Sequence, residues 1–522
     1  MKFSRIARVL PTWKNALLAV LSAILLILAF PDFEYWFLAW FALVPLLLAV
    51  EREKESTARS FACGWLFGFV FFTGSCWWLT YAPIHYAEFP VALAYFLLCC
   101  VTAVAGIFPA LFAAITSVLL RRFGSWAFLG VPFVWVATEF ARYWITGNNW
   151  NAIGYSQAFT ESTPVLAGFG GVLLVSFAVI LNSTFIAVWW LNRQRYYLLV
   201  FAVLYLIVFS DVNIFDPPVY DFLEYPGRPN DSQVIAVQPN VPMSGLDSEK
   251  WAVLRDRQIA LAEKTISRNK GEGIGEKEKG STTVILPESP MNYQWDEDPD
   301  FQRYIGQFAA RNNVSVLFNS AEPDAKNHKY FNSAVMIDAT GREVAEYDKI
   351  YLLPFGEAVP TPLENIVPGF VGNFSYGKNY SLVPLGDAKA GIMICFESHF
   401  GELSREYVRR GADALIEMTN DGYLGPTPVL RQHLANAVFR AIETNRPVLR
   451  VTNVGITAYI NERGEVLDAT KPYTEDTRVW SVAKSDGSQT FYVKYGDWFA
   501  WLCSAITAIF LIFIFIKRNP TE

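Results

Sequence analysis

The sequence predicts a protein in two parts, an α-helical transmembrane bundle of about eight spans and a polar α/β domain. Of the 522 residues, 52% are hydrophobic and only 18% are charged, and the apolar excess lies before residue 212 and after residue 496. Several of these apolar stretches have the roughly 20 residues that a helix needs to cross a bilayer. Between them, short apolar segments alternate with polar, helix-like segments, a pattern typical of a mixed sheet covered by helices.

The apolar stretches give the expected spans and domain boundaries. Spans are expected at 15–31, 35–50, 61–81, 90–119, 126–144, 166–191, 196–211 and 498–516. No small-residue cleavage pattern follows the first span, so we interpret it as a retained anchor and not as a signal peptide. The predicted domains are a seven-span bundle (1–211), a linker (212–233), the polar α/β domain (234–496) and a closing span with a tail (497–522).

The basic residues predict the orientation of the bundle. Lys and Arg occur in the segments 2–14, 52–59, 121–122, 193–195 and 517–518, which all fall on one side, whereas the loops 31–34 and 83–90 contain none. Because basic loops stay in the cytoplasm, both termini are expected there and the polar domain on the opposite side.

Charge and cysteine content give no sign of nucleic-acid binding or of a metal site. The formal net charge of −6 gives no reason to expect nucleic acid. The six cysteines and four histidines lack metal-ligand spacing, so neither a metal site nor a cofactor is expected.

One predicted outer loop is unusually polar and aromatic. The segment 147–157 contains Trp150 and Tyr155 among several asparagines. It is interpreted either as an interfacial aromatic belt, which the composition favours, or as a re-entrant lining of a site. Glu139 and Arg142 precede it, and they fit either a structural ion pair or part of a lipid headgroup site.

In the polar domain, apolar runs end in reactive side chains. Strands are expected near 234–240, 282–288, 314–319, 414–421, 447–453 and 457–460, a β-hairpin over 333–347, and helices over 248–268, 301–312, 401–410 and 431–444. Glu288 ends one strand, Lys349 follows the hairpin, and Cys395 follows the apolar run 391–394.

These three side chains suit acyl transfer through a thioester. A carboxylate would take the thiol proton, the cysteine would attack a carbonyl carbon, and the ammonium group would stabilise the developing oxyanion. At a turn from strand to helix, unpaired N–H groups would favour a thiolate at Cys395. The alternative interpretation is a buried core cysteine, which is a common environment for a free thiol.

The flanking residues resemble the nitrilase superfamily. The matching blocks are Leu286-Pro-Glu-Ser289, Tyr347-Asp-Lys349 with Pro354-Phe-Gly-Glu357, and Cys395-Phe-Glu397. The resemblance implies an αββα sandwich in which Glu288 is the general base, Lys349 stabilises the oxyanion and Cys395 is the nucleophile. It also implies that Glu357 is a second carboxylate of the site and that Phe396 and Glu397 support the nucleophile. Glu397 could hold the turn through backbone N–H groups, which we favour, or take part in the chemistry.

The spans and the polar domain together resemble the apolipoprotein N-acyltransferase family of bacterial inner membranes over nearly the whole chain. Supporting blocks are Gly154-Tyr-Ser-Gln157, Gln238-Pro-Asn240, Gln432-His-Leu434 and Arg446-Pro-Val-Leu-Arg450. The resemblance implies that a phospholipid, typically phosphatidylethanolamine, acylates Cys395, and that the thioester then acylates the N-terminal amine of a diacylglyceryl-cysteine in an apolipoprotein. It further implies a multi-pass inner-membrane protein with a periplasmic catalytic domain.

Some residues depart from the family pattern or leave alternatives open. The segment Asn420-Asp-Gly-Tyr-Leu-Gly425 has Tyr423 and Leu424 where the family often has larger aromatic side chains. Tyr423, Trp251 and Tyr155 are candidate substrate-binding residues, although an ordinary packed role is equally expected for Trp251. The alternative functions are a membrane-tethered amidase acting on soluble C–N compounds and a binding-only transporter or scaffold; the complete Glu, Lys and Cys set argues against the last.

Overall fold

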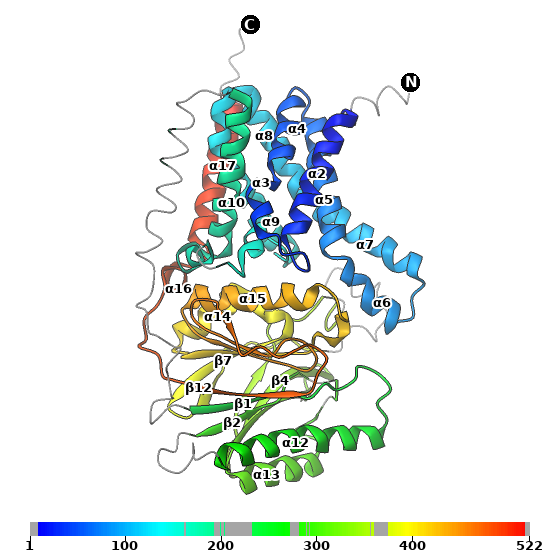
Figure 1. Ribbon diagram of the computed structural model, residues 1–522, viewed down its shortest axis with the longest axis vertical. Helices are drawn as coiled ribbons and strands as arrows, with labels where there is room; N and C mark the ends of the chain where they lie inside the picture. Colours follow the sequence, from blue (N-terminus) through cyan, green and yellow to red (C-terminus); the bar gives the residue numbers. More distant parts are fainter. Residues whose placement is uncertain are drawn as a thin grey trace. The chain divides into compact units, whose positions relative to one another are not determined.

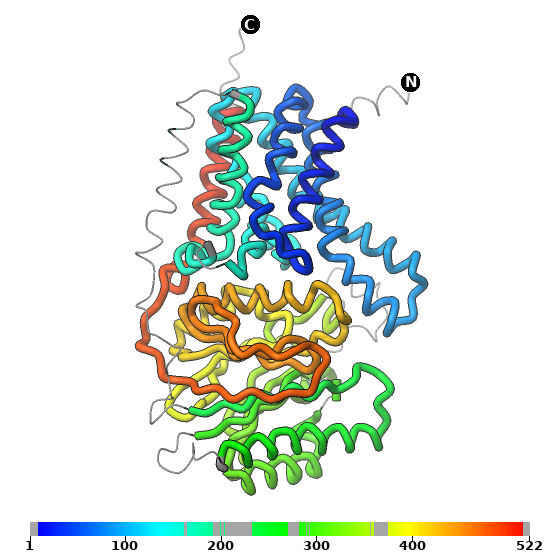
Figure 2. The backbone as a smooth tube through the Cα atoms, in the orientation of Figure 1, coloured from blue at the N-terminus to red at the C-terminus, as the bar shows by residue number. Residues whose placement is uncertain are grey.

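The chain packs into two compact units (Figures 1 and 2). The computed structural model describes residues 9–160, 163–192, 199, 203, 232–271, 281–288, 290, 291, 293–354, 356–359 and 374–516. The helical unit contains Met1–Pro218, Thr427–Ala435 and Tyr495–Glu522, and the α/β unit contains Val219–Pro426 and Asn436–Lys494. Almost all of the predicted span 196–211 and of the predicted linker 212–233 lies outside the described residues.

Apolar helices build the helical unit. They are α2 (Trp13–Ala29), α3 (Ala39–Ala42), α4 (Val44–Arg52), α5 (Thr57–Ser75), α6 (Tyr81–His85), α7 (Val91–Ala105), α8 (Ile107–Phe123), α9 (Val131–Thr146), α10 (Ala167–Asn192) and α17 (Trp498–Ile516). Among the described residues, the stretches Val91–Thr146 and Pro164–Leu191 are long and apolar enough to cross a membrane, and a third span results if α5 and the segment Trp77–His85, bent by 62°, are counted together. The larger number of about eight spans stays a prediction.

The predicted span 90–119 is divided in the structure. Gly106 separates α7 from α8, and Figure 1 shows α7 with α6 beside the rest of the bundle. A Cβ atom at Gly106 would lie 3.1 Å from the backbone nitrogen of Phe69 and 3.2 Å from the carbonyl oxygen of Trp65, both on α5. The close approach of α5 therefore favours glycine at the break, and the hydropathy pattern alone does not reveal it.

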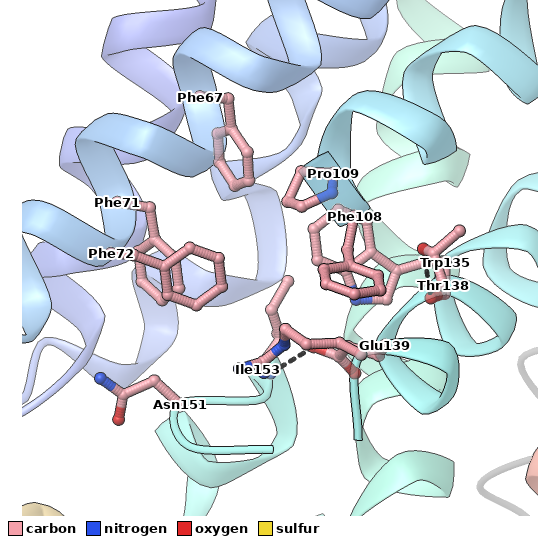
Figure 3. Close-up of a pocket in the computed structure, with 11 residues that line it drawn as sticks. Phe67, Phe71, Phe72, Phe108, Pro109, Trp135, Thr138, Glu139, Asn151 and Ile153 are labelled. Atoms are coloured by element: carbon pink, nitrogen blue, oxygen red, sulfur yellow. Dashed lines mark hydrogen bonds between the residues drawn. The ribbon is translucent and has the colours of Figure 1, made fainter. Parts of the chain in front are cut away.

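The polar loop after α9 is buried inside the helical unit, so the interpretation as an interfacial belt is wrong. Trp150, Ile153 and Tyr155 are 9%, 1% and 4% exposed. The Glu139 carboxylate accepts a hydrogen bond from the backbone nitrogen of Ile153 (2.8 Å), as Figure 3 shows, and Arg142 donates to the carbonyl oxygen of Trp150 (2.9 Å). The two charged side chains thus satisfy loop backbone groups that would be costly to bury unpaired.

A buried glutamine, Gln432, joins its own helix to three other segments of the helical unit. Oε1 of Gln432 accepts hydrogen bonds from the indole nitrogens of Trp78 (3.1 Å) and Trp150 (2.9 Å), and a longer one from Asn151 (3.4 Å). Its amide nitrogen donates to the carbonyl oxygens of Pro31 (3.3 Å) and Ser75 (3.0 Å). Gln432 thereby uses its acceptor and both donors inside the unit.

Two six-stranded sheets form the core of the α/β unit. Their strands are β1 (Ser232–Gln238), β2 (Thr282–Ile285), β3 (Ser315–Asp324), β4 (Lys329–Ile337), β5 (Glu343–Asp348), β6 (Leu382–Leu385), β7 (Ala388–Ile394), β8 (Ala414–Thr419), β9 (Val448–Thr452), β10 (Ala458–Ile460), β11 (Val466–Leu467) and β12 (Asp476–Val482). The orders are β12-β1-β2-β3-β4-β5 and β11-β10-β9-β8-β7-β6. Three parallel strands lie in the middle of each sheet, and antiparallel strands flank them.

Helices cover the outer face of each sheet. Figure 1 shows α12 (Ser248–Gly271) and α13 (Pro299–Asn312) against the sheet with β1, and α14 (Gly401–Arg409) and α15 (Val429–Thr444) against the sheet with β7. Ile235 and Val237 of β1 pack in one core with α12 and α13, whereas the alternate residues Val234 and Ala236 are equally buried on the other face. This confirms the predicted αββα sandwich, because a sheet buried on both faces lies between a helical layer and a second sheet.

Candidate active site

The turn at Cys395 is a strained backbone position. β7 ends at Ile394, and the 3-10 helix Cys395–His399 follows before α14 begins. Cys395 has φ +52°, in the left-handed region that costs a non-glycine residue about 1 kcal/mol or more. Its side chain is partly exposed, whereas Phe396, which stacks on His399, is 7% exposed. The strain presents the thiol at the end of the sheet.

Glu397 holds this turn by hydrogen bonds. One carboxylate oxygen accepts from the backbone nitrogen of Ile394 (2.8 Å). The other accepts from the backbone nitrogens of Ile350 (2.7 Å) and Tyr351 (3.0 Å) and from the Tyr347 hydroxyl (2.7 Å). Glu397 is fully buried. Because it accepts hydrogen bonds from both segments, it connects the turn at Cys395 to the segment that carries Lys349. These contacts are those expected of a supporting residue.

Lys349 lies between two carboxylates. Its ammonium nitrogen is 2.8 Å from Glu357 and 3.9 Å from Glu288, and its side chain is 1% exposed. Glu357 also accepts a hydrogen bond from the backbone nitrogen of Leu353 (2.7 Å), which fixes it beside the lysine. Glu288 is a hydrogen-bond partner of the Cys395 thiol. The structure therefore brings Glu288, Lys349, Glu357 and Cys395 together.

Asn332 belongs to this group and was missed by the sequence analysis. Its amide nitrogen donates to Glu357 (2.7 Å) and to Glu288 (3.1 Å), and its oxygen accepts from Asn319 (2.7 Å). The available signal was a polar residue, Asn332, beside the predicted hairpin arm 333–338. An asparagine there also fits a turn, and only the pairing of β3, β4 and β5 turns its side chain toward the carboxylates.

A backbone group completes the environment of Glu288. The second carboxylate oxygen accepts a hydrogen bond from the backbone nitrogen of Asn420 (3.1 Å), directly after β8. The side chain of Asn420 in turn accepts from Gly422 (3.3 Å) and Asn453 (3.2 Å), which shapes the segment 420–425. The segment that departs from the family pattern therefore also positions Glu288.

The electrostatics of the site favour a neutral thiol in the resting protein. Burial raises the pKa of Cys395 well above its ordinary value and the charge of Glu288 adds to this, whereas Lys349 and the Thr419 hydroxyl act in the opposite direction. The expectation that a helix terminus favours a thiolate is therefore wrong. Only a short 3-10 turn follows Cys395, and loss of hydration disfavours the charged form more than that turn favours it.

The carboxylate and the lysine are perturbed in ways that suit their proposed roles. Burial raises the pKa of Glu288, opposed by Lys349 and reinforced by Glu357. Burial alone would lower the pKa of Lys349, but Glu357 and Glu288 outweigh it and raise the pKa above its usual value. Lys349 thus stays an ammonium group, while Glu288 is a stronger base than an exposed carboxylate.

The three candidate substrate-binding residues have different environments. Trp251 donates to the carbonyl oxygen of Met291 (2.8 Å) and packs edge-on against Tyr293, so it is part of the α12 core. Tyr423 is 49% exposed in the 3-10 turn Asp421–Leu424, and Tyr155 is buried in the helical unit. A substrate contact for any of them stays a prediction.

Comparison with known families matches both units. Residues 22–185 match the apolipoprotein N-acyltransferase N-terminal domain, and residues 248–490 match the carbon-nitrogen hydrolase domain. A solved amidase from Nesterenkonia sp. AN1 is 14% identical with a TM-score of 0.38, and the match covers 52% of this chain and 96% of that chain.

Full-length relatives are more similar. The apolipoprotein N-acyltransferase of Thermotoga maritima is 30% identical, over 96% of this chain and 94% of its own. That of Geobacter metallireducens is also 30% identical, over 97% of this chain and 96% of its own. Because this identity extends over nearly the whole length of both chains, the protein belongs to the apolipoprotein N-acyltransferase family.

Proposed function

We propose that the protein transfers an acyl chain from a phospholipid, through a thioester on Cys395, to the N-terminal amine of diacylglyceryl-cysteine in apolipoproteins. The observation that carries this proposal is that Glu288, Lys349 and Cys395 lie together in one site. The relatives of this chain are named apolipoprotein N-acyltransferase. Phosphatidylethanolamine is the proposed donor.

The first half-reaction uses all three side chains. Glu288 accepts the proton of the Cys395 thiol, and the sulfur attacks the ester carbonyl carbon of the lipid. The Lys349 ammonium group stabilises the oxyanion, and Glu357, 2.8 Å away, keeps that ammonium group in place. The tetrahedral intermediate then collapses, and the proton on Glu288 goes to the leaving oxygen of the lysophospholipid.

In the second half-reaction the amine is the nucleophile and the Cys395 sulfur is the leaving group. The uncharged N-terminal amine of the apolipoprotein attacks the thioester carbonyl carbon, Glu288 takes the amine proton, and the sulfur leaves as a thiolate that is reprotonated. A covalent intermediate lets one site serve two lipid-borne substrates in turn, which is ping-pong chemistry.

A membrane location fits substrates that reside in the bilayer. We infer a multi-pass inner-membrane protein of about eight spans, with both termini cytoplasmic and a periplasmic catalytic domain. The absence of Lys and Arg from the loops 31–34 and 83–90 supports this orientation.

The proposal is tested by mass spectrometry of the full-length protein after incubation with phosphatidylethanolamine vesicles. The expected result is one acyl mass on the peptide that carries Cys395, released by neutral hydroxylamine. Cys395→Ala should abolish the added mass, whereas Cys100→Ser, at an exposed thiol in α7, should keep it. An acyl mass on the Cys395→Ala protein would contradict the assignment of the nucleophile.

The same preparation tests Lys349 and the acceptor. Lys349→Ala should slow thioester formation by roughly 10² to 10³-fold, because one oxyanion donor contributes about 3 kcal/mol. The acyl-enzyme should lose its chain to a diacylglyceryl peptide with a free N-terminus. Equally fast loss to water alone would instead support an amidase-like hydrolase.

A further inference from the structure

Thr419 lies beside Cys395 at the end of the neighbouring strand. β7 and β8 are parallel, with Ile394 opposite Met418, so the next residues along the two strands are Cys395 and Thr419. Thr419 is fully buried, and its hydroxyl lies close enough to the Cys395 sulfur to oppose the rise in the pKa of that thiol. The sheet register thus places an alcohol beside the reacting atom, and the mechanism above does not use it.

The hydroxyl of Thr419 is held only weakly by its carboxylate partner. It donates to Oδ1 of Asp421 over 3.4 Å, whereas O–H···O hydrogen bonds are usually near 2.7–2.8 Å. A hydroxyl group has a single proton to donate, so it serves either Asp421 or the sulfur at any one time.

Asp421 is itself fixed by a buried arginine. Oδ2 of Asp421 lies 2.8 Å from Arg450, which also forms an ion pair with Glu417, and all three side chains are at most 2% exposed. A Cβ atom at position 455 would lie 2.1 Å from the same carboxylate oxygen, so Gly455 leaves the space that this carboxylate occupies. A buried triad of this kind often adds little to stability, which leaves room for a functional reason.

We propose that Thr419 is a further catalytic residue whose hydroxyl turns from Asp421 to the Cys395 sulfur as the thiolate forms. When Glu288 takes the thiol proton, the sulfur becomes a strong acceptor and the hydroxyl rotates to donate to it. No atom is exchanged in the rotation, and it reverses when the sulfur bonds to the acyl carbon. Asp421, anchored by Arg450, acts as the positioning residue. The inference rests on the proposed function only for the identity of the electrophile that the sulfur attacks, the ester carbonyl carbon of a phospholipid.

The test measures the reactivity of Cys395 without any lipid. Full-length protein in detergent is treated with iodoacetamide across a range of pH, and the modified Cys395 peptide is quantified by mass spectrometry. Below the thiol pKa the rate follows the thiolate fraction, and a hydrogen bond to a charged group corresponds to about one pH unit. Thr419→Val should therefore react about tenfold more slowly at a given pH, and Thr419→Ser should restore the wild-type profile.

Two further variants separate this role from a merely structural one. Thr452, opposite Thr419 on β9, is equally buried, and its hydroxyl donates to Gln238 (3.1 Å), so Thr452→Val is the matched control and should leave the profile unchanged. Asp421→Asn removes a negative charge near the sulfur and leaves a weaker, neutral acceptor for the Thr419 hydroxyl, so it should speed alkylation, opposite in sign to Thr419→Val.

Each outcome decides the proposal. An unchanged profile in Thr419→Val, or an equal loss in Thr419→Ser, overturns it. If Thr419→Val does not fold, the Asp421→Asn protein decides instead, and slower or unchanged alkylation there overturns the inference. Shifted alkylation together with no acyl mass on Cys395 would refute the acyltransferase function and leave the role of Thr419 standing.

Discussion

Glu288 receives hydrogen bonds from three directions, and this explains why a largely buried carboxylate, 14% exposed, can remain a base. The Asn332 amide, the Asn420 backbone nitrogen and the Cys395 thiol all donate to it, and Lys349 lies 3.9 Å away. These donors and the cation favour the ionised form, and burial opposes them. The net effect is a raised pKa, which increases the affinity of Glu288 for the thiol proton.

The raised pKa of Glu288 predicts how thioester formation depends on pH. The ionised form is the base, so the rate should rise as pH increases through a value above the ordinary 4.5 of a glutamate. Lys349 remains protonated on the alkaline side, because its pKa is raised as well. We therefore expect no loss of rate from lysine deprotonation below about pH 10.

Single-turnover acylation measured against pH checks this expectation. Glu288→Gln serves as the control, since an amide cannot accept the proton, and it should remove the acidic limb together with most of the rate. A wild-type profile that falls between neutral pH and about pH 9 would contradict the assignment of Lys349 as the persistent cation.

At the scale of the element, the turn after β7 is maintained against its own conformational preference. Cys395 has φ +52°, and Glu397 offsets the cost by accepting hydrogen bonds from Ile394 on one side and from Ile350 and Tyr351 on the other. The strain is thus a property of the turn, separable from the chemistry of the sulfur.

This strain predicts an unusual order of stabilities. Cys395→Gly should be more stable than Cys395→Ala, because glycine adopts positive φ without steric cost. The free energy of unfolding should be about 1 kcal/mol larger for Cys395→Gly, and its unfolding temperature should be higher. At Cys503, buried in the helix α17, the order should be reversed, since glycine is about 1 kcal/mol worse than alanine inside a helix. Thermal unfolding of the four variants in detergent measures both orders. If Cys395→Ala is more stable than Cys395→Gly, as expected for the matching pair at position 503, the turn is not strained.

At the scale of the whole chain, one segment within the carbon-nitrogen hydrolase match (residues 248–490) belongs to the helical unit and not to the α/β unit. The segment Thr427–Ala435 packs there through Gln432, whose amide contacts groups near residues 31, 75, 78 and 150. Its neighbour Arg431 forms an ion pair with Glu34, and both side chains are about one-third exposed.

These adjacent residues should differ strongly in their effect on stability. Gln432→Leu leaves two indole N–H groups and two carbonyl oxygens without this partner, at about 1–3 kcal/mol for each group that finds no other partner. Arg431→Ala removes a partly exposed ion pair, and such a pair at a surface is worth at most about 1 kcal/mol. Thermal unfolding followed by tryptophan fluorescence should therefore show a far larger loss for Gln432→Leu, and equal losses would contradict the buried network.

Much of the site could be predicted because its residues follow strands. Glu288, Lys349 and Cys395 were identified from the polar side chains at the ends of apolar runs, and the β4–β5 hairpin from its alternating pattern. Asn332 and Thr419 were missed because each lies within or at the end of a strand, where a polar residue has many explanations. The strands β6 and β12 were also missed, since their sequences lack a strong alternation.

The sequence by itself determined the apolar helices, the α/β domain with its mixed sheets and the three reactive side chains, because hydrophobic periodicity and motif spacing are local properties of the chain. Only the tertiary structure decided that Asn332 bridges two carboxylates, that Thr419 adjoins the sulfur, that burial raises the pKa of the Cys395 thiol and that residues 149–157 of the polar loop are buried. Those facts depend on strand register and on contacts between residues far apart in the chain, and a local pattern contains no information about either.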